Sequence, residues 1–267
     1  MKKPQILLTN DDGIRSPGLW AAAASLSELG FVTVTAPREQ SSGMGRSLPS
    51  TSEGTIQLEQ VQVNGQEWSV YAVGGSPAQS VLHGVYEVLK FKPDLVVSGI
   101  NYGENLGLGV TVSGTVGAAL EGAASGIPSL AISLETIIEH HLSYSDEVDF
   151  STAAHFTAFF GKLLLEKKFP EDVSVLKVDI PSDAIPETPW EVTRLSKVRM
   201  FDAVSPERES WDEPARVGYR YSDEFRKARE GSDIHAVRIK RWVSVTPLSL
   251  DLTSRADFSE VEAALRK

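Results

Sequence analysis

The sequence predicts an α/β fold in which helices cover both faces of a mainly parallel sheet, and three observations support this. Short apolar runs alternate with helical patterns over the first 135 residues, as in parallel strands joined by helical crossovers. Ser-Pro pairs, which are typical of a helix cap and first turn, precede two of the expected helices. The chain has 267 residues, of which 41% are hydrophobic, enough for one large α/β domain.

The first expected elements are a strand, a helix and a second strand. Residues 5–9 form a short apolar run, which predicts a buried strand. The Ser-Pro pair at 16–17 opens a helix rich in Ala and Leu that should stop near Gly30. Residues 31–36 are β-branched and predict a second strand, followed by a Ser- and Gly-rich loop over 38–50.

A β-hairpin is expected over residues 55–73, because Asn64-Gly65 separates two runs of alternating apolar side chains. The second Ser-Pro pair, at 76–77, predicts a helix that runs to about Lys90. The remaining core elements are expected as a strand at 94–100, a helix at 115–125, a strand at 129–133, a helix at 151–167 and a strand at 173–180.

The last third of the chain is less regular. Residues 181–235 hold much of the proline and many charges, and they predict no clear element. Residues 237–245 alternate like a strand, and residues 258–266 predict a short terminal helix. This part has too little apolar sequence for a strong core of its own. We therefore expect a single domain with a core over about 1–180 and an irregular extension over about 181–267.

Composition and charge disfavour several classes of protein. A net charge of -10 argues against a stable long nucleic acid partner, but it allows a small anionic substrate held by a metal ion and backbone N–H groups. The absence of cysteine excludes disulfides, zinc-thiolate sites and thiol catalysis. Apolar runs are too short for a membrane span or a signal peptide, so we expect a cytoplasmic protein.

An acidic pair, Asp11-Asp12, follows the first expected strand, at the sheet edge where open α/β sheets bind ligands. Adjacent carboxylates repel unless a cation or hydrogen-bond donors offset their charge, and Mg²⁺ or Mn²⁺ would suit their oxygens. An ordinary strand-end turn is the competing interpretation. Asn101 and Ser42, which follow two other expected strands, favour the metal site because they bring further oxygen ligands to the same edge.

Ser113-Gly114-Thr115 opens the helix at 115–125 and predicts a phosphate site. Ser113 or Thr115 could cap this helix, Gly114 allows close approach to the backbone, and a helix N-terminus favours an anion. An ordinary helix cap would explain the same residues. Gly43 and Asn105, in neighbouring loops, could add donors. The chain has no P-loop, and the first strand does not lead into the Rossmann glycine triplet.

Four motifs occur in order along the chain. They are Leu8-Thr9-Asn10-Asp11-Asp12-Gly13-Ile14, Ala36-Pro37 with Ser41-Ser42-Gly43, Ser98-Gly99-Ile100-Asn101 with Asn105, and Ser113-Gly114-Thr115-Val116. Together they resemble the signature of the SurE family, the survival-protein 5′/3′-nucleotidases. Thr193-Arg194 and residues 243–248 look like later blocks of the family, so the similarity covers nearly the whole chain.

The resemblance implies a Rossmann-like three-layer core and hydrolysis of nucleoside 5′-monophosphates, with 3′-monophosphates as a further candidate. It also implies one divalent cation per subunit, Mg²⁺ or Mn²⁺, with Ca²⁺ as an alternative in a crystal. The implied assembly is a homodimer or homotetramer with swapped C-terminal segments. The implied metal ligands are Asp11, Asp12, Ser42 and Asn101, and the implied phosphate and substrate site comprises Asn10, Gly43, Asn105, Ser113, Gly114 and Thr115.

Five positions depart from the family pattern, and none of them is a proposed metal ligand. These departures bear on what the resemblance implies about the preferred substrate, about proton transfer near the site and about the contacts between subunits. The five are Arg38, Arg46, Gln79, Val112 and Arg241.

Asp11 and Asp12 are also the catalytic candidates, because either could accept the proton of an attacking water while a metal ion stabilises the phosphate charge. A covalent aspartyl-phosphate at Asp11 is an alternative. Dehalogenase-type phosphatases carry a second Asp two residues after the first, and Gly13 stands there. A metal–nucleotide-binding regulatory protein without catalysis, and a structural subunit that binds no metal, are the other readings.

Overall fold

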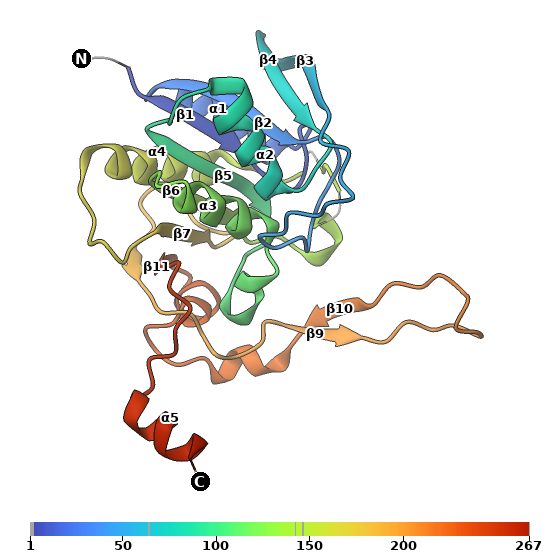
Figure 1. Ribbon diagram of the computed structural model, residues 1–267, viewed down its shortest axis with the longest axis vertical. Helices are drawn as coiled ribbons and strands as arrows, with labels where there is room; N and C mark the ends of the chain where they lie inside the picture. Colours follow the sequence, from blue (N-terminus) through green and yellow to red (C-terminus); the bar gives the residue numbers. More distant parts are fainter. Residues whose placement is uncertain (1–2, 64, 142, 146, 267) are drawn as a thin grey trace.

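The computed structural model describes residues 3–63, 65–141, 143–145 and 147–266. Its main sheet has the strand order β3-β4-β2-β1-β5-β6-β7-β11-β8 (Figure 1). The strands are β1 (Gln5–Thr9), β2 (Phe31–Pro37), β3 (Ile56–Val63), β4 (Gln66–Val73), β5 (Leu95–Tyr102), β6 (Ser129–Leu134), β7 (Val175–Ile180), β8 (Trp190–Val192) and β11 (Val243–Leu248).

Helices cover both faces of this sheet, which confirms the expected three-layer α/β/α fold. On one face, α1 (Pro17–Ser27) and α4 (Ser151–Glu166) pack with side chains such as Leu8. On the other, α2 (Pro77–His83) and α3 (Gly114–Ala124) pack with Leu7 and its neighbours. Successive residues of β1 therefore point into opposite layers, as expected for a strand buried on both sides.

The central strands run parallel, and this brings their carboxyl ends to one edge of the sheet. β1 pairs in parallel with β2 and β5, and β5 pairs in parallel with β6. The expected hairpin is present as the antiparallel pair β3–β4, and its Asn64 lies outside the described residues. The third core strand extends to Tyr102, so Asn101 is the second-last residue of the strand rather than following it.

Two expected elements differ from the structure. The helix expected after Ser76 is α-helical only to His83, and residues Gly84–Leu89 continue it as a π-helix. Gly84 packs closely against β2 there. The strand expected at 237–245 is wrong in its first half, because residues 235–240 form another π-helix. Its buried face packs against Leu106 and Met200, far away in sequence, so tertiary burial outweighs the local alternation.

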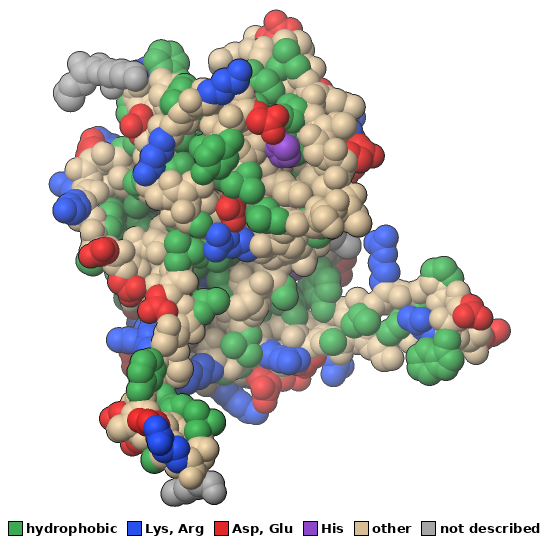
Figure 2. Space-filling view, in the orientation of Figure 1, with side chains coloured by type: hydrophobic (Ala, Val, Ile, Leu, Met, Phe, Trp, Pro, Cys, Tyr) green, Lys and Arg blue, Asp and Glu red, His purple; other side chains and the backbone are tan. Residues whose placement is uncertain are grey.

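Residues after 180 contribute to the sheet and also leave it. β8 and β11 extend the main sheet beyond β7. β9 (Phe201–Val204) and β10 (Gly218–Tyr221) form a separate antiparallel ribbon. With the segment between them they make up residues 201–221, called the arm below, which extends away from the body (Figure 1). The terminal helix α5 (Phe258–Leu265) stands apart and has no buried residue. Hydrophobic side chains are visible on both the arm and α5 (Figure 2).

Within the described residues, no helix combines the length and the apolar character that crossing a membrane would require.

Candidate functional site

The loops that follow β1, β2 and β5 meet the start of α3 around a cavity of about 330 Å³. This is the carboxyl edge of the parallel strands, where the sequence places the site. Six of the expected site residues line this one cavity: Asp11, Ser42, Gly43, Asn101, Asn105 and Ser113. The other four, Asn10, Asp12, Gly114 and Thr115, are not among the lining residues. The first three are sequence neighbours of Asp11 or Ser113, and Thr115 is hydrogen-bonded to Asp11.

Asp11 is held by the start of α3. The Thr115 hydroxyl donates a hydrogen bond to Asp11 Oδ1. A Cβ atom on Gly114 would come within 2.7 Å of the Asp11 Cβ, so this close approach requires glycine. Burial raises the pKa of the Asp11 carboxyl, while hydrogen bonds from Thr115 and the Gly114 backbone oppose that rise. Gly114 and Thr115 thus face the carboxylate, and the Thr115 hydroxyl is already engaged there.

Asp12 is also almost completely buried. Its Oδ2 accepts a hydrogen bond from the Tyr102 backbone N–H at 3.2 Å, and its Oδ1 accepts one from Gln40 at 3.4 Å. Burial raises the pKa of Asp12 well above its usual range, and the charge of Asp11 raises it further. Among the described residues, no Lys or Arg forms an ion pair with either aspartate. Two buried carboxylates without a cationic side chain suit a bound divalent ion.

Asn101 completes a set of hard oxygen donors. Its Nδ2 donates to the Gly103 carbonyl at 2.6 Å, which leaves the amide oxygen available as a ligand. Together with Ser42 and the aspartates, this set fits Mg²⁺ or Mn²⁺ better than a soft metal. No cluster of three or more His, Asp or Glu residues suited to a metal occurs in the part of the chain that the structure describes. The candidate site therefore combines two carboxylates with neutral oxygens.

Two expected substrate residues make local structure instead. Asn10 closes its own turn, since its side chain bonds to the backbone of Gly13 at 3.0 and 3.2 Å. Ser113 caps α3 by accepting the Val116 N–H at 3.1 Å. The ordinary-turn and ordinary-cap interpretations thus describe part of the motif, while the same segments still border the cavity.

A fully buried ion network, which none of the sequence motifs indicates, holds the loop that carries Asn105. The Lys177 ammonium donates to the Asn105 carbonyl at 2.9 Å, and Asp179 accepts the Asn105 backbone N–H at 2.7 Å. Lys177 also pairs with Asp179 and, at 3.3 Å, with Asp233, which accepts the Gly107 N–H at 2.8 Å. Burial alone would lower the pKa of Lys177, but the two carboxylates raise it overall. Lys177 and Asp179 lie inside the otherwise apolar strand β7, and these two charges are the feature of the sequence that indicates a buried ion pair.

Aromatic side chains form another wall of the cavity. Phe201 and Tyr219, at the root of the arm, line it together with His141. The rings of Tyr219 and His141 are stacked, with centroids 6.1 Å apart and an interplanar angle of 21°. Burial lowers the pKa of His141, which favours its neutral form. No local sequence pattern links these three rings to the site.

Most positions that depart from the family pattern lie away from the cavity. Three arginines form ion pairs: Arg38 with Glu53 at 3.3 Å, Arg46 with Glu121 at 2.7 Å, and Arg241 with Asp183 at 2.7 Å. Gln79 closes a capping box with Ser76 at the start of α2. Val112 is the one departure among the lining residues, so it bears most directly on substrate preference.

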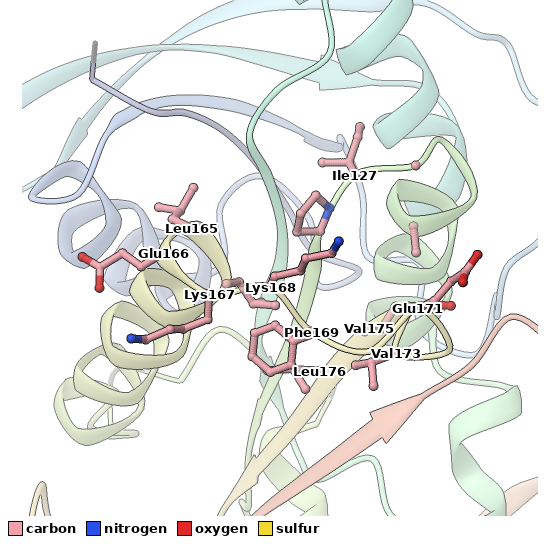
Figure 3. A pocket seen from close by; sticks show the side chains of 15 residues that line it. Ile127, Leu165, Glu166, Lys167, Lys168, Phe169, Glu171, Val173, Val175 and Leu176 are labelled. Carbon is pink, nitrogen blue, oxygen red and sulfur yellow. The ribbon is translucent and has the colours of Figure 1, made fainter. Parts of the chain in front are cut away.

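A larger cavity of about 560 Å³ lies at the opposite edge of the sheet, where the chain enters β6 and β7 (Figure 3). Residues 164–169 and 173–176 form most of its walls, and both Lys168 and Phe169 contribute side chains. It contains none of the expected site residues and no acidic pair comparable to Asp11 and Asp12. The smaller cavity at the carboxyl edge is therefore the candidate site.

Comparisons with known proteins show the family of the chain. The family model described as survival protein SurE matches residues 6–202. A 5′-nucleotidase SurE from Archaeoglobus fulgidus is 45% identical over 259 residues, covering 97% of this chain and 96% of the relative. One from Methanosarcina mazei is 41% identical over 269 residues, covering 98% of each chain. The crystal structure of the SurE protein from Aquifex aeolicus superposes with a TM-score of 0.77 at 35% identity, covering 99% of this chain and 100% of that one. The resemblance seen in the motifs is thus confirmed, and the chain belongs to the SurE family.

Proposed function

We propose that this chain is a metal-dependent nucleotidase that hydrolyses nucleoside 5′-monophosphates to nucleoside and phosphate. The observation that carries the proposal is the convergence of Asp11, Ser42 and Asn101 on one cavity, together with the burial of the neighbouring Asp12. The names of the relatives, 5′-nucleotidase SurE, support the same activity. Nucleoside 3′-monophosphates are a further candidate substrate.

Asp11, Asp12, Ser42 and Asn101 would hold one Mg²⁺ or Mn²⁺ ion per subunit. When bound, such an ion would stabilise negative charge on the phosphate and make water more acidic. One of the two aspartates accepts the proton of the attacking water, and their burial keeps bulk water from weakening these interactions.

The phosphate would lie beside the segments that border the cavity near the acidic pair. Gly43 offers a backbone N–H and Asn105 a side-chain amide, whose Nδ2 also donates to Ser133 Oγ at 2.9 Å. The buried ion network fixes the Asn105 backbone on both sides, so this amide is held in place before substrate binds. Gly114 and Thr115 act mainly by orienting Asp11.

A phosphate-release screen tests the proposal. Purified protein should release phosphate from AMP and other nucleoside monophosphates with Mg²⁺ or Mn²⁺, lose this activity in EDTA, and regain it when the ion is restored. Asp12→Asn should lose most of the turnover while keeping its fold. Asp172→Asn, the same change at an exposed aspartate that does not line this cavity, should leave turnover unaffected.

Absence of phosphate release across the whole panel would reject hydrolysis. Nucleotide binding without release would favour the regulatory alternative. Near-normal turnover of Asp12→Asn at saturating metal would show that the ligand assignment is wrong.

The same proposal includes a homodimer or homotetramer joined by the C-terminal segments. α5 carries apolar side chains with no buried position, and Leu252 before it is 93% exposed. Beside them lies a groove of about 1050 Å³, whose apolar walls include Leu108 and Val192. A second copy of the chain could bury both surfaces. A variant ending at Ser249 should therefore form an assembly of fewer subunits than the full chain, as measured by the molar mass in multi-angle light scattering. An unchanged number of subunits would refute this assembly.

We also place the reaction in the cytoplasm, with no membrane partner and no stable long nucleic acid partner. The lack of cysteine and the net charge of -10 support this placement.

A further inference from the structure

We propose that the aromatic wall formed by Phe201, Tyr219 and His141 is a nucleobase-binding subsite, so that the site selects phosphate esters that carry a base. This inference rests on the proposed function, because it assigns the second half of the cavity that holds the phosphate. None of the residues in the four sequence motifs belongs to this wall.

The first support is that the rings and the metal-site candidates line the same cavity. Asp11, Ser42 and Asn101 line it, and so do Phe201, Tyr219 and His141. Its volume of about 330 Å³ lies at the lower end of the roughly 300–1,000 Å³ found for small-molecule sites. A ligand with its phosphate at the acidic pair and a planar group at the rings would use both.

The second support is that the rings are held in a fixed orientation and remain partly exposed. Tyr219 is 40% exposed and Phe201 is only partly buried, although both belong to an aromatic cluster. Their centroids are 5.4 Å apart at 76°, and the Tyr219 hydroxyl lies 3.2 Å from His141 Nδ1. These contacts fix the orientation of Tyr219 while leaving part of its ring uncovered. A fixed, partly open aromatic ring is what a stacking base requires.

The third support is charge. The wall itself contains no Lys or Arg, and burial lowers the pKa of His141, which favours the neutral ring. A second phosphate group is therefore poorly suited to this end of the cavity, whereas an uncharged aromatic base is well suited to it. The wall thus complements the acidic, metal-binding end instead of repeating its chemistry.

The rings could instead serve only to attach the arm to the body, and substrates with and without a base separate the two roles. AMP and ribose 5-phosphate share the phosphate and sugar, but only AMP has a base. Tyr219→Leu should raise KM for AMP roughly 5- to 150-fold, as the loss of one stacking contact predicts, with little change in kcat. Kinetics on ribose 5-phosphate should be unaffected.

Two further variants sharpen the test. Tyr219→Phe keeps the ring and should retain the low KM for AMP. Tyr86→Leu makes the same change at an exposed tyrosine of another cavity and should leave both substrates unaffected. Equal losses on AMP and ribose 5-phosphate, or an unchanged KM for AMP in Tyr219→Leu, would overturn the base subsite while leaving the nucleotidase proposal intact.

Failure of the proposed function has a different signature, because the wild type would then release phosphate from neither substrate. In that case, calorimetric titration with adenosine, which lacks a phosphate, still tests the wall. Binding that is lost in Tyr219→Leu and kept in Tyr219→Phe would support the subsite, and absence of adenosine binding to the wild type would reject it.

Discussion

Replacing Lys177 by Met should destabilise the protein strongly, because the change removes the one cation of the fully buried ion network. Lys177, Asp179 and Asp233 have no exposed side-chain surface. Without the ammonium, two carboxylates remain buried next to each other, and the Asn105 carbonyl loses its 2.9 Å hydrogen bond. Breaking a buried pair in this way costs about 3–5 kcal/mol in free energy of unfolding. For a chain of this size that corresponds to a fall in Tm of roughly 6–20 °C.

Urea unfolding followed by circular dichroism measures this difference directly. Lys162→Met is the matched control, since Lys162 forms an exposed pair with Glu166 at 3.9 Å, and such pairs contribute about 0–1 kcal/mol. Activity should also fall at temperatures where Lys177→Met is still folded, because the loop carrying Asn105 is no longer held. A difference below about 1 kcal/mol between the two variants would refute the reasoning, since it would mean that the remaining carboxylates tolerate burial without their cation.

Three other outcomes follow from the site. Thr115→Val should weaken Mn²⁺ binding about 10- to 100-fold by removing a hydrogen bond that orients Asp11, whereas Thr115→Ser and the surface change Thr111→Val should bind normally in calorimetry. Burial raises the pKa values of Asp11 and Asp12 in the metal-free protein, so metal affinity should rise with pH and metal binding should release protons. Calorimetry in buffers of different ionisation enthalpy measures this release, and binding without proton release would contradict the explanation. Burial raises the pKa of Glu104 to about 8, so its contribution to stability is present below about pH 4.5 and is lost as the pH rises towards 8. Glu104→Gln should accordingly gain stability on the order of 5 kcal/mol over the wild type at pH 9 and about 1 kcal/mol at pH 5, and equal gains at both values would rule out this explanation.

Local signals were sufficient for most of the core. Ser76 and Gln79 form the capping box that starts α2, and the hairpin β3–β4 follows its alternating pattern. The metal-site candidates were also predictable, because β1, β2 and β5 are neighbouring parallel strands whose carboxyl ends share one edge. Because Asp11, Ser42 and Asn101 lie at or after the carboxyl ends of these strands, their place in the sequence was enough to predict that they line one cavity.

The parts that were missed depend on contacts between distant segments. Residues 237–240 alternate between apolar and basic side chains as in a strand, yet Val237 lies in a helix and packs with Leu106 and Met200. Phe201 and Tyr219 meet only because two short strands pair in a region with few local signals, and His141 joins them from another part of the chain. Such pairings cost chain entropy that only tertiary contacts offset, so a local pattern does not reveal them.

The position of β11 limits how far the enzyme can be shortened. β11 comes from near the end of the chain but lies beside β7, antiparallel to it, inside the main sheet. A protein truncated after Ile180 would therefore have β7 as an exposed edge strand with unpaired backbone groups. Such edge strands pair with other chains and promote aggregation. The first 180 residues contain every predicted metal ligand, yet they are not a self-sufficient fragment from which to build a minimal catalyst.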